Sequence, residues 1–333
     1  MSAKCPLCGG SSSLVENWRD PVEPRDYQVL RCAACGVEFA DPFRFPGGAW
    51  YEKYNDAAGY EEGTGGPSPA RFEFVLARLA PGAKILDVGT AAGGFVKLAR
   101  SRGFDAEGLE LDRRMIAAAQ REGLPVREGL LDEAFAAAHA GKFDAVTMFD
   151  VLEHLDDPKG ILKLARKVLK PSGVVGLSTP NALRPGPFGR DSWDYPPHHL
   201  TRWTPSAMRS FLEREGWTVS AFDTGSLPAW EFSRVFADRS ARALLRSYKS
   251  LRYGAGQADA PMSQLAPSAG GADAPDPARG RRRRLVAFYH EAFNVAFYPI
   301  FGVLAFVFRL TTPGAGTTLT VVADCRRLQS KKD

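Results

Sequence analysis

The sequence has little net charge, few cysteines and no apolar segment at its N-terminus. Its 333 residues carry 43 Lys and Arg against 38 Asp and Glu, and the formal net charge of +5 gives no reason by itself to expect nucleic acid. The first ten residues, MSAKCPLCGG, contain no apolar signal region, so we expect a cytoplasmic protein in a reducing compartment. The length and the 44% hydrophobic content predict one sizeable core with smaller attachments.

Four of the five cysteines form two Cys-x-x-Cys pairs, and each pair is followed by a glycine that frees the backbone to wrap N–H groups around thiolate sulfurs. In a reducing compartment, two matched pairs indicate a closed tetrahedral zinc site rather than disulfides or a single redox couple. Such a site would also supply folding energy to a segment too small for its own core. We therefore predict a structural zinc ribbon over residues 1–45, with Cys5, Cys8, Cys32 and Cys35 as ligands.

The stretch 84–95, KILDVGTAAGGF, predicts a short buried strand, a glycine-rich turn and the start of a helix. This arrangement directs backbone N–H groups at a ligand lying across the strand ends, and many nucleotide-binding sheets share it. Read as Asp87-x-Gly89-x-Ala91-x-Gly93, the stretch resembles the first motif of class I S-adenosylmethionine (SAM)-dependent methyltransferases. The resemblance implies that the acidic residue helps to hold the methionine end of SAM. Ala91 stands where the family has a glycine. The cofactor-binding residues expected here are Asp87, Gly89, Thr90, Ala91 and Gly93.

Two further strands are predicted at 104–111 and 124–129. A carboxylate that ends the first of them, about 20 residues after the turn, sits where a ribose diol would be held. We assign that role to Glu110, with Leu111 beside the cofactor, because Asp112 has the position of a helix N-cap. The alternative is that both carboxylates are solvated caps. Where related sequences have an acidic residue near the adenine, this chain has a leucine, and Asp132 is the adenine-side contact that we consider.

The segment from 142 to 158 contains FDAVTMFDVLEHLDDP, which resembles the corresponding part of class I methyltransferases that modify small molecules and sugars. It predicts a fourth strand ending in Asp150, which we include among the cofactor-binding residues. Glu153 and His154 follow on a helix, where they could reach the pocket or brace the helix against the sheet. A turn at 169–173 and a fifth strand at 174–181 complete the resemblance. Strand–helix alternation independently predicts an α/β fold with a doubly wound, mostly parallel, seven-stranded sheet.

Residues 185–204 are too rich in Pro, Gly and aromatics for regular structure, and long ordered loops of this kind are usually functional. The part from 194 to 204 resembles a loop of sugar and polysaccharide methyltransferases. Some relatives that methylate sugar carbon carry His-Glu-His there, whereas this chain has Pro197, His198 and His199. Histidine suits proton removal from a hydroxyl near neutral pH. We predict His199 as the catalytic base and His198 as a second candidate; alternatively, one of them packs in the loop or caps the next helix.

The methyltransferase domain is expected over 46–225 and 314–333, with a closing antiparallel strand at 317–323. An insertion, 226–313, interrupts it. Its part 254–284 is predicted to be a disordered linker that ends in four arginines, and 285–310 is predicted to be an apolar helical segment. The uninterrupted apolar run there has 14 residues, which is short for a membrane span. We consider either a buried helix or lid, or peripheral contact of 281–310 with the inner face of a membrane.

These patterns together predict a SAM-dependent methyltransferase, with SAM and structural Zn²⁺ as cofactors, that acts on a sugar, glycan or lipid-linked hydroxyl in processes such as polysaccharide biosynthesis. One alternative is an RNA methyltransferase that grips RNA through the ribbon, but nucleic acid is disfavoured because Ser178-Thr179-Pro180-Asn181 lacks the motif used on exocyclic amines. A nicotinamide-dependent reductase is a third alternative, although no Tyr-x-x-x-Lys pair occurs. A non-catalytic, membrane-associated SAM-binding scaffold is the fourth.

Overall fold

The computed structural model describes residues 3–58, 69–184, 194–225 and 316–325, together with the single residues 300, 303, 306 and 307. The chain divides into two compact units. The first consists of Met1–Arg184, Gly189–Gly225 and Gly316–Asp333 and contains both β-sheets. The second consists of Pro185–Phe188 and Ser226–Ala315. The site developed below lies within the first unit.

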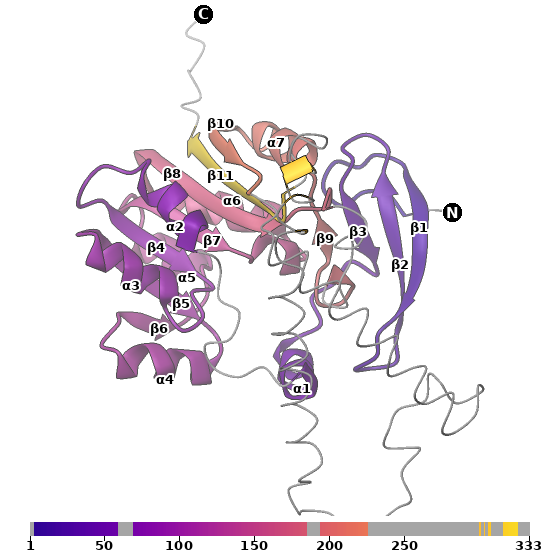
Figure 1. The fold of residues 1–333 in the computed structure, drawn as a ribbon, viewed down its shortest axis with the longest axis horizontal. Coiled ribbons are helices and arrows are strands. Elements are labelled where there is room, and N and C mark those ends of the chain that lie inside the picture. Colours follow the sequence, from indigo (N-terminus) through magenta and orange to yellow (C-terminus); the bar gives the residue numbers. More distant parts are fainter. Residues whose placement is uncertain are drawn as a thin grey trace, which may run out of the picture. The chain divides into compact units, whose positions relative to one another are not determined.

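The larger sheet has seven strands in the order β10-β11-β8-β7-β4-β5-β6 (Figure 1). Strands β7, β4, β5 and β6 run parallel to one another, β8 runs parallel to β7, and β11 pairs antiparallel with both β8 and β10. The predicted doubly wound, mostly parallel sheet and its antiparallel closing strand are therefore confirmed. The strands are β4 (Lys84–Val88), β5 (Asp105–Glu110), β6 (Val126–Glu128), β7 (Phe143–Phe149), β8 (Leu169–Pro180), β10 (Trp217–Asp223) and β11 (Thr318–Cys325).

Helices cover both faces of this sheet. Successive residues of its central strands accordingly belong to different apolar clusters. On β4, Ile85 joins a cluster with Phe72 and Phe95 of the helices α2 and α3, whereas Leu86 joins one with Leu162 of α6. A strand buried on both faces reads as an apolar run, as this one does. The helices are α1 (Gly48–Ala58), α2 (Pro69–Leu76), α3 (Gly94–Ser101), α4 (Arg113–Arg121), α5 (Glu133–Ala138), α6 (Pro158–Val168) and α7 (Pro205–Arg214).

The smaller sheet is antiparallel and contains the N-terminal segment: β1 (Ser12–Arg19), β2 (Asp26–Cys32) and β3 (Glu38–Asp41). Its fourth strand, β9 (Thr201–Arg202), comes from the far end of the histidine-containing loop and lies beside β3 (Figure 1). Glu38 pairs with Arg202 and Phe39 with Thr201. No pattern in the sequence indicated that the N-terminal ribbon and this loop would belong to one sheet.

The helix α1 forms in a stretch with low apolar content, for which the sequence indicated no element. Two local predictions need correction. The predicted turn at 169–173 lies inside β8, where a register shift against β7 accommodates extra residues between Leu169 and Val174. Glu153 and His154 lie on a short 3₁₀ turn, η1 (Leu152–His154), rather than on an α-helix, since Pro158 starts a new helix only after Asp157 caps it.

Most of the predicted insertion, including the linker at 254–284 and the four arginines, lies outside the described residues. The four described residues of the apolar segment, Ile300, Val303, Phe306 and Val307, are helical and exposed within their own unit. Among the residues that the structure describes, no helix is long and apolar enough to cross a membrane. The roles proposed for this insertion stay predictions.

Candidate functional site

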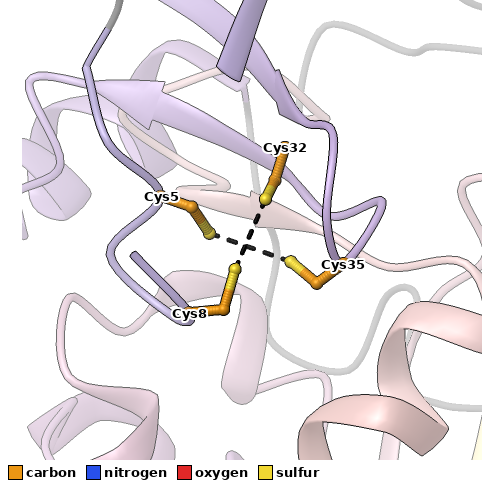
Figure 2. Close-up of side chains that lie close together, drawn as sticks. All are labelled: Cys5, Cys8, Cys32 and Cys35. Carbon is orange, nitrogen blue, oxygen red and sulfur yellow. Dashed lines mark hydrogen bonds between the residues drawn. The ribbon is translucent and has the colours of Figure 1, made fainter. Parts of the chain in front are cut away.

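The four predicted zinc ligands meet on two turns of the small sheet (Figure 2). The Sγ atoms of Cys5 and Cys35 are 3.8 Å apart, those of Cys8 and Cys32 are 3.4 Å apart, and none of the four forms a disulfide. A tetrahedral zinc ion with Zn–S bonds of about 2.3 Å places its sulfurs about 3.8 Å apart. The cluster therefore fits zinc in both ligand type and spacing.

The surroundings of the cysteines also suit a metal. A Cβ placed on Gly10 would lie 3.1 Å from the Cys32 Sγ and 2.9 Å from the Cβ of Ala34, so the backbone passes too close to the sulfurs for any other residue. Burial raises the pKa of the Cys5 thiol far above its usual range. Burial also acts on Cys32, but backbone N–H groups at Cys35 and Ala34 outweigh it and lower the pKa to about 7. A bound cation would favour the thiolate form of all four.

The glycine-rich turn after β4 is built for close approach to a ligand. Gly89 has φ +70°, and a Cβ there would lie 2.7 Å from Cγ2 of Val151. Ala91, at the family's glycine position, also adopts a left-handed conformation, with φ +49°. A non-glycine residue pays roughly 1–2 kcal/mol for this region, and such strain persists where the surroundings impose it, commonly at functional sites. Alanine therefore occupies here a left-handed conformation that usually favours glycine.

Glu110 connects this turn to the end of β5. Its carboxylate accepts hydrogen bonds from the backbone N–H of Ala91 at 2.8 Å, of Leu111 at 2.7 Å and of Asp112 at 3.0 Å. These bonds hold the carboxylate at the carboxyl ends of β4 and β5, where ligands of open α/β sheets bind. A carboxylate has about four acceptor sites, so it retains capacity for a ribose hydroxyl. Asp112 caps α4 by accepting from the Arg114 N–H, as predicted.

The other residues at the predicted cofactor site differ in burial and in hydrogen bonding. Asp87 is 2% exposed and accepts a hydrogen bond of 2.6 Å from the Thr147 hydroxyl; burial raises its pKa to about 7. Asp132 caps α5 by accepting from the Phe135 N–H, which gives it a structural role that the sequence did not indicate. Leu111 and Leu130 follow neighbouring strands and are 53% and 57% exposed, which leaves two apolar side chains uncovered at the predicted adenine end.

Asp150 ends β7 in a left-handed conformation, with φ +57°. Arg71 of α2, itself buried, donates to both carboxylate oxygens at 2.7 and 2.9 Å and to the Ser178 hydroxyl at 3.0 Å. The hydroxyl of Ser178 in turn donates to Asp150 at 3.1 Å. This ion pair connects the ends of β7 and β8 to α2, and Arg71 had no recognisable signal in the sequence.

Three histidines gather immediately beyond this point. The rings of His154 and His199, and those of His154 and His198, have centroids 4.8 Å apart, and those of His198 and His199 are 4.7 Å apart. The structure thus brings the two predicted catalytic residues together with His154. The contact between Gly89 and Val151 fixes η1, which carries His154, directly against the cofactor turn.

The histidine cluster is enclosed by residues from α1 and from the loop. Tyr51 places its hydroxyl 3.2 Å from His154 Nδ1, and Tyr54 stacks on His198 with centroids 4.6 Å apart. Both tyrosines therefore pack on the histidines. Their spacing of three residues on one helix was the only sequence signal that they share a face.

Burial favours the uncharged form of two of the three histidines. It lowers the pKa of His154 to about 3, with a smaller contribution from the neighbouring His199. It lowers the pKa of His199 to about 4, against the opposing effect of Asp194, whose Oδ1 lies 3.5 Å from His199 Nδ1. Glu153 is 1% exposed, and burial followed by the charge of Asp150 raises its pKa well above the usual range. The site therefore offers two neutral imidazoles at pH 7, those of His154 and His199.

Comparison with known proteins identifies the domain that contains the larger sheet. Residues 67–221 match a family model described as a methyltransferase domain. The chain carries a class I SAM-dependent methyltransferase domain. The ubiquinone biosynthesis O-methyltransferase of Xanthomonas axonopodis pv. citri (strain 306) is 36% identical over 132 residues, which cover 38% of this chain and 55% of that protein. The protein of the same name from Psychrobacter arcticus is 38% identical over 109 residues, 30% of this chain and 42% of that one. The chain spans about half the length of these curated relatives.

Solved structures show weaker likenesses. A SAM-dependent methyltransferase from Archaeoglobus fulgidus is 14% identical, covers 76% of this chain and 94% of that one, and has a TM-score of 0.44. A second, from Mesorhizobium loti, is 17% identical, covers 76% and 97%, and has a TM-score of 0.41. These likenesses are too low to bear on substrate or mechanism.

Proposed function

We propose that this protein transfers the methyl group of SAM to a hydroxyl of a small molecule, most plausibly a sugar, glycan or lipid-linked acceptor. The observation that carries the proposal is the histidine cluster next to the cofactor turn, connected to it by the Val151–Gly89 contact. Relatives that are named for O-methyl transfer support a hydroxyl as the acceptor group. The sugar or glycan class rests on the sequence resemblance of the loop alone.

The residues at the strand ends have the right chemistry for SAM. Asp87 and the backbone of the glycine turn would hold its methionine end, Glu110 its ribose, and the exposed leucines 111 and 130 would cover its adenine. When bound, SAM supplies an electrophilic methyl group on a positively charged sulfur. Asp150, held by Arg71, places a carboxylate near that end of the site.

The chain's own contribution to the reaction is alignment and proton removal. Holding an acceptor oxygen in line with the methyl carbon is worth several kcal/mol of the barrier in well-oriented systems. His199 has Nδ1 directed at Asp194, so its Nε2 can take the hydroxyl proton, and Asp194 would stabilise the resulting imidazolium. His198, less buried and stacked on Tyr54, would contact the acceptor.

Calorimetric titration with SAM, S-adenosylhomocysteine and NADH tests the cofactor first. We expect micromolar binding of the first two and no binding of NADH. Radiolabelled methyl transfer to panels of sugars, lipid-linked glycans and phenols then tests the acceptor, with His199→Ala as the variant and His139→Gln, on a histidine outside the cluster, as the control. Full turnover by His199→Ala with the true acceptor would remove His199 from the reaction; absence of SAM binding by the folded protein would contradict methyl transfer from SAM.

A further inference from the structure

The three histidines have the arrangement of a metal-binding site. Each can offer one ring nitrogen so that all three nitrogens lie within 4.8 Å of one another. His154 comes from η1 and the other two from the loop after residue 193, so two separate segments converge on one point. In the part of the chain that the structure describes, the only other cluster of this kind is formed by the four cysteines.

Polar groups behind two of the rings lie close to their Nδ1 atoms. His154 Nδ1 lies 2.6 Å from the carbonyl oxygen of His198, a distance that requires an N–H at Nδ1 and leaves the lone pair on Nε2. His199 Nδ1 lies 3.5 Å from Oδ1 of Asp194, a buried carboxylate that is also held by Arg184. Histidines that bind metals typically donate their other N–H to a backbone carbonyl or a carboxylate. His154 does so, and the Asp194 carboxylate lies where it could take that role for His199.

A buried acid next to His154 in the sequence indicates an unfilled polar contact near the cluster. Glu153 precedes His154, and neither of its carboxylate oxygens has a hydrogen-bond partner among the described residues. An orphaned buried carboxyl group is costly, and native structures rarely retain one without a reason. Tyr51, which reaches His154 and the His198 carbonyl through its hydroxyl, closes the same region.

We propose that His154, His198 and His199 bind a divalent transition metal through three imidazoles, with Zn²⁺ as the ion whose preferences they fit best. Three histidines with an open fourth position are the ligand set of catalytic zinc sites. Zn–N bonds of about 2.0–2.1 Å place tetrahedral nitrogens about 3.4 Å apart, so the rings need to close by about 1.4 Å at most. Rotation of His198, which like His154 is partly exposed, can supply much of that movement.

The open position would take an oxygen of water or of the acceptor. This part of the inference rests on the proposed function. An acceptor hydroxyl bound at the open position would lose its proton more readily to solvent. His199 would then act as a metal ligand and not as the base. Metal binding itself does not depend on the acceptor, and it can be measured without turnover.

Titration of the metal-stripped full chain with Co²⁺ tests the proposal. We expect two Co²⁺ per chain, one with the intense thiolate-to-cobalt absorption of the ribbon and one with only the weaker visible bands of nitrogen and oxygen ligands. Cys32→Ser should remove the first signal and keep the second. His198→Gln and His199→Gln should each weaken the second site at least about tenfold, whereas His139→Gln should leave both unchanged.

A single Co²⁺ per wild-type chain at millimolar metal, or a second ion that survives both histidine substitutions, would overturn the metal site. The wild-type stoichiometry decides the matter even if a histidine variant fails to fold. SAM binding, measured by calorimetry on the same samples, separates the two proposals. If the chain binds SAM but only one metal, methyl transfer stands and the histidine site is wrong. If it binds two metals but no SAM, the histidine site stands and methyl transfer is wrong.

Discussion

The packing of Gly89 against Val151 can be tested quantitatively. Gly89→Ala puts a Cβ into a left-handed residue at φ +70° and 2.7 Å from Val151 Cγ2. The backbone strain costs roughly 1–2 kcal/mol. Relief of the clash costs about 1–3 kcal/mol more, because a β-branched side chain has few other rotamers and the contact lies between two elements of the site.

Gly82 provides the matched control. It has nearly the same backbone, φ +72°, but a Cβ there would meet nothing within 4 Å. Gly82→Ala should therefore lose only the strain of roughly 1–2 kcal/mol, and Gly89→Ala should lose about 1–3 kcal/mol more than this control. Urea unfolding monitored by tryptophan fluorescence measures both free energies. Gly89→Ala should also weaken SAM binding, which Gly82→Ala should leave intact.

A double-mutant cycle isolates the contact. Val151→Ala removes the methyl groups that the new Cβ would meet, so the double variant should be less destabilised than the sum of the two single variants by about 1–3 kcal/mol. Equal destabilisation by the two glycine substitutions, together with additivity in the cycle, would show that η1 does not press against the cofactor turn. The proposed link between the histidine cluster and SAM would then lose its structural basis.

Three other outcomes are expected. Cys32→Ser should release the ribbon's zinc, measured by plasma mass spectrometry, and abolish amide protection in β1–β3; retained zinc and protection would contradict the four-cysteine site. Because burial raises the pKa of Asp87 from 3.8 to about 7, the folded protein holds a proton that the unfolded chain releases. Stability should therefore fall as pH rises from about 4 to 7, by up to about 4 kcal/mol, and urea titrations should show a flatter profile for Asp87→Asn. Glu38→Ala should cost about 3 kcal/mol in the same assay, because the Glu38 carboxylate holds the buried guanidinium of Arg202 at 2.9 Å; a loss below about 1 kcal/mol would contradict this.

The sequence predicted those features that depend on local patterns. Paired cysteines at short spacing indicated one metal cluster, and alternating apolar strands and helices indicated the seven-stranded sheet, including its antiparallel closing strand. Asp112 was identified as a helix cap because capping needs only the residues beside it. In each case the determining interactions lie within a few residues or repeat along the chain.

Contacts between distant segments escaped prediction. The pairing of Arg71 with Asp150, the packing of Tyr51 on His154 and the joining of β9 to β3 link residues that are 79, 103 and more than 150 positions apart. No periodicity encodes such partners. The helix α1 was not predicted for a related reason. Its sequence has few apolar residues at helical spacing, and the helix is stabilised by packing of Trp50 and the two tyrosines against the histidine loop.

The N-terminal ribbon and the histidine loop pack together and share one sheet, although they lie far apart in the sequence. The loop enters the ribbon with Tyr195 stacked on Trp18 at 3.9 Å and leaves it through β9, where Arg202 contacts Glu38. His198 and His199 lie between these two anchors. Loop segments are ordinarily mobile, yet an imidazole needs a fixed position to remove a proton or bind a metal. On this arrangement the four cysteines would contribute to the proposed site by holding the strands against which this loop packs, without touching any reacting group.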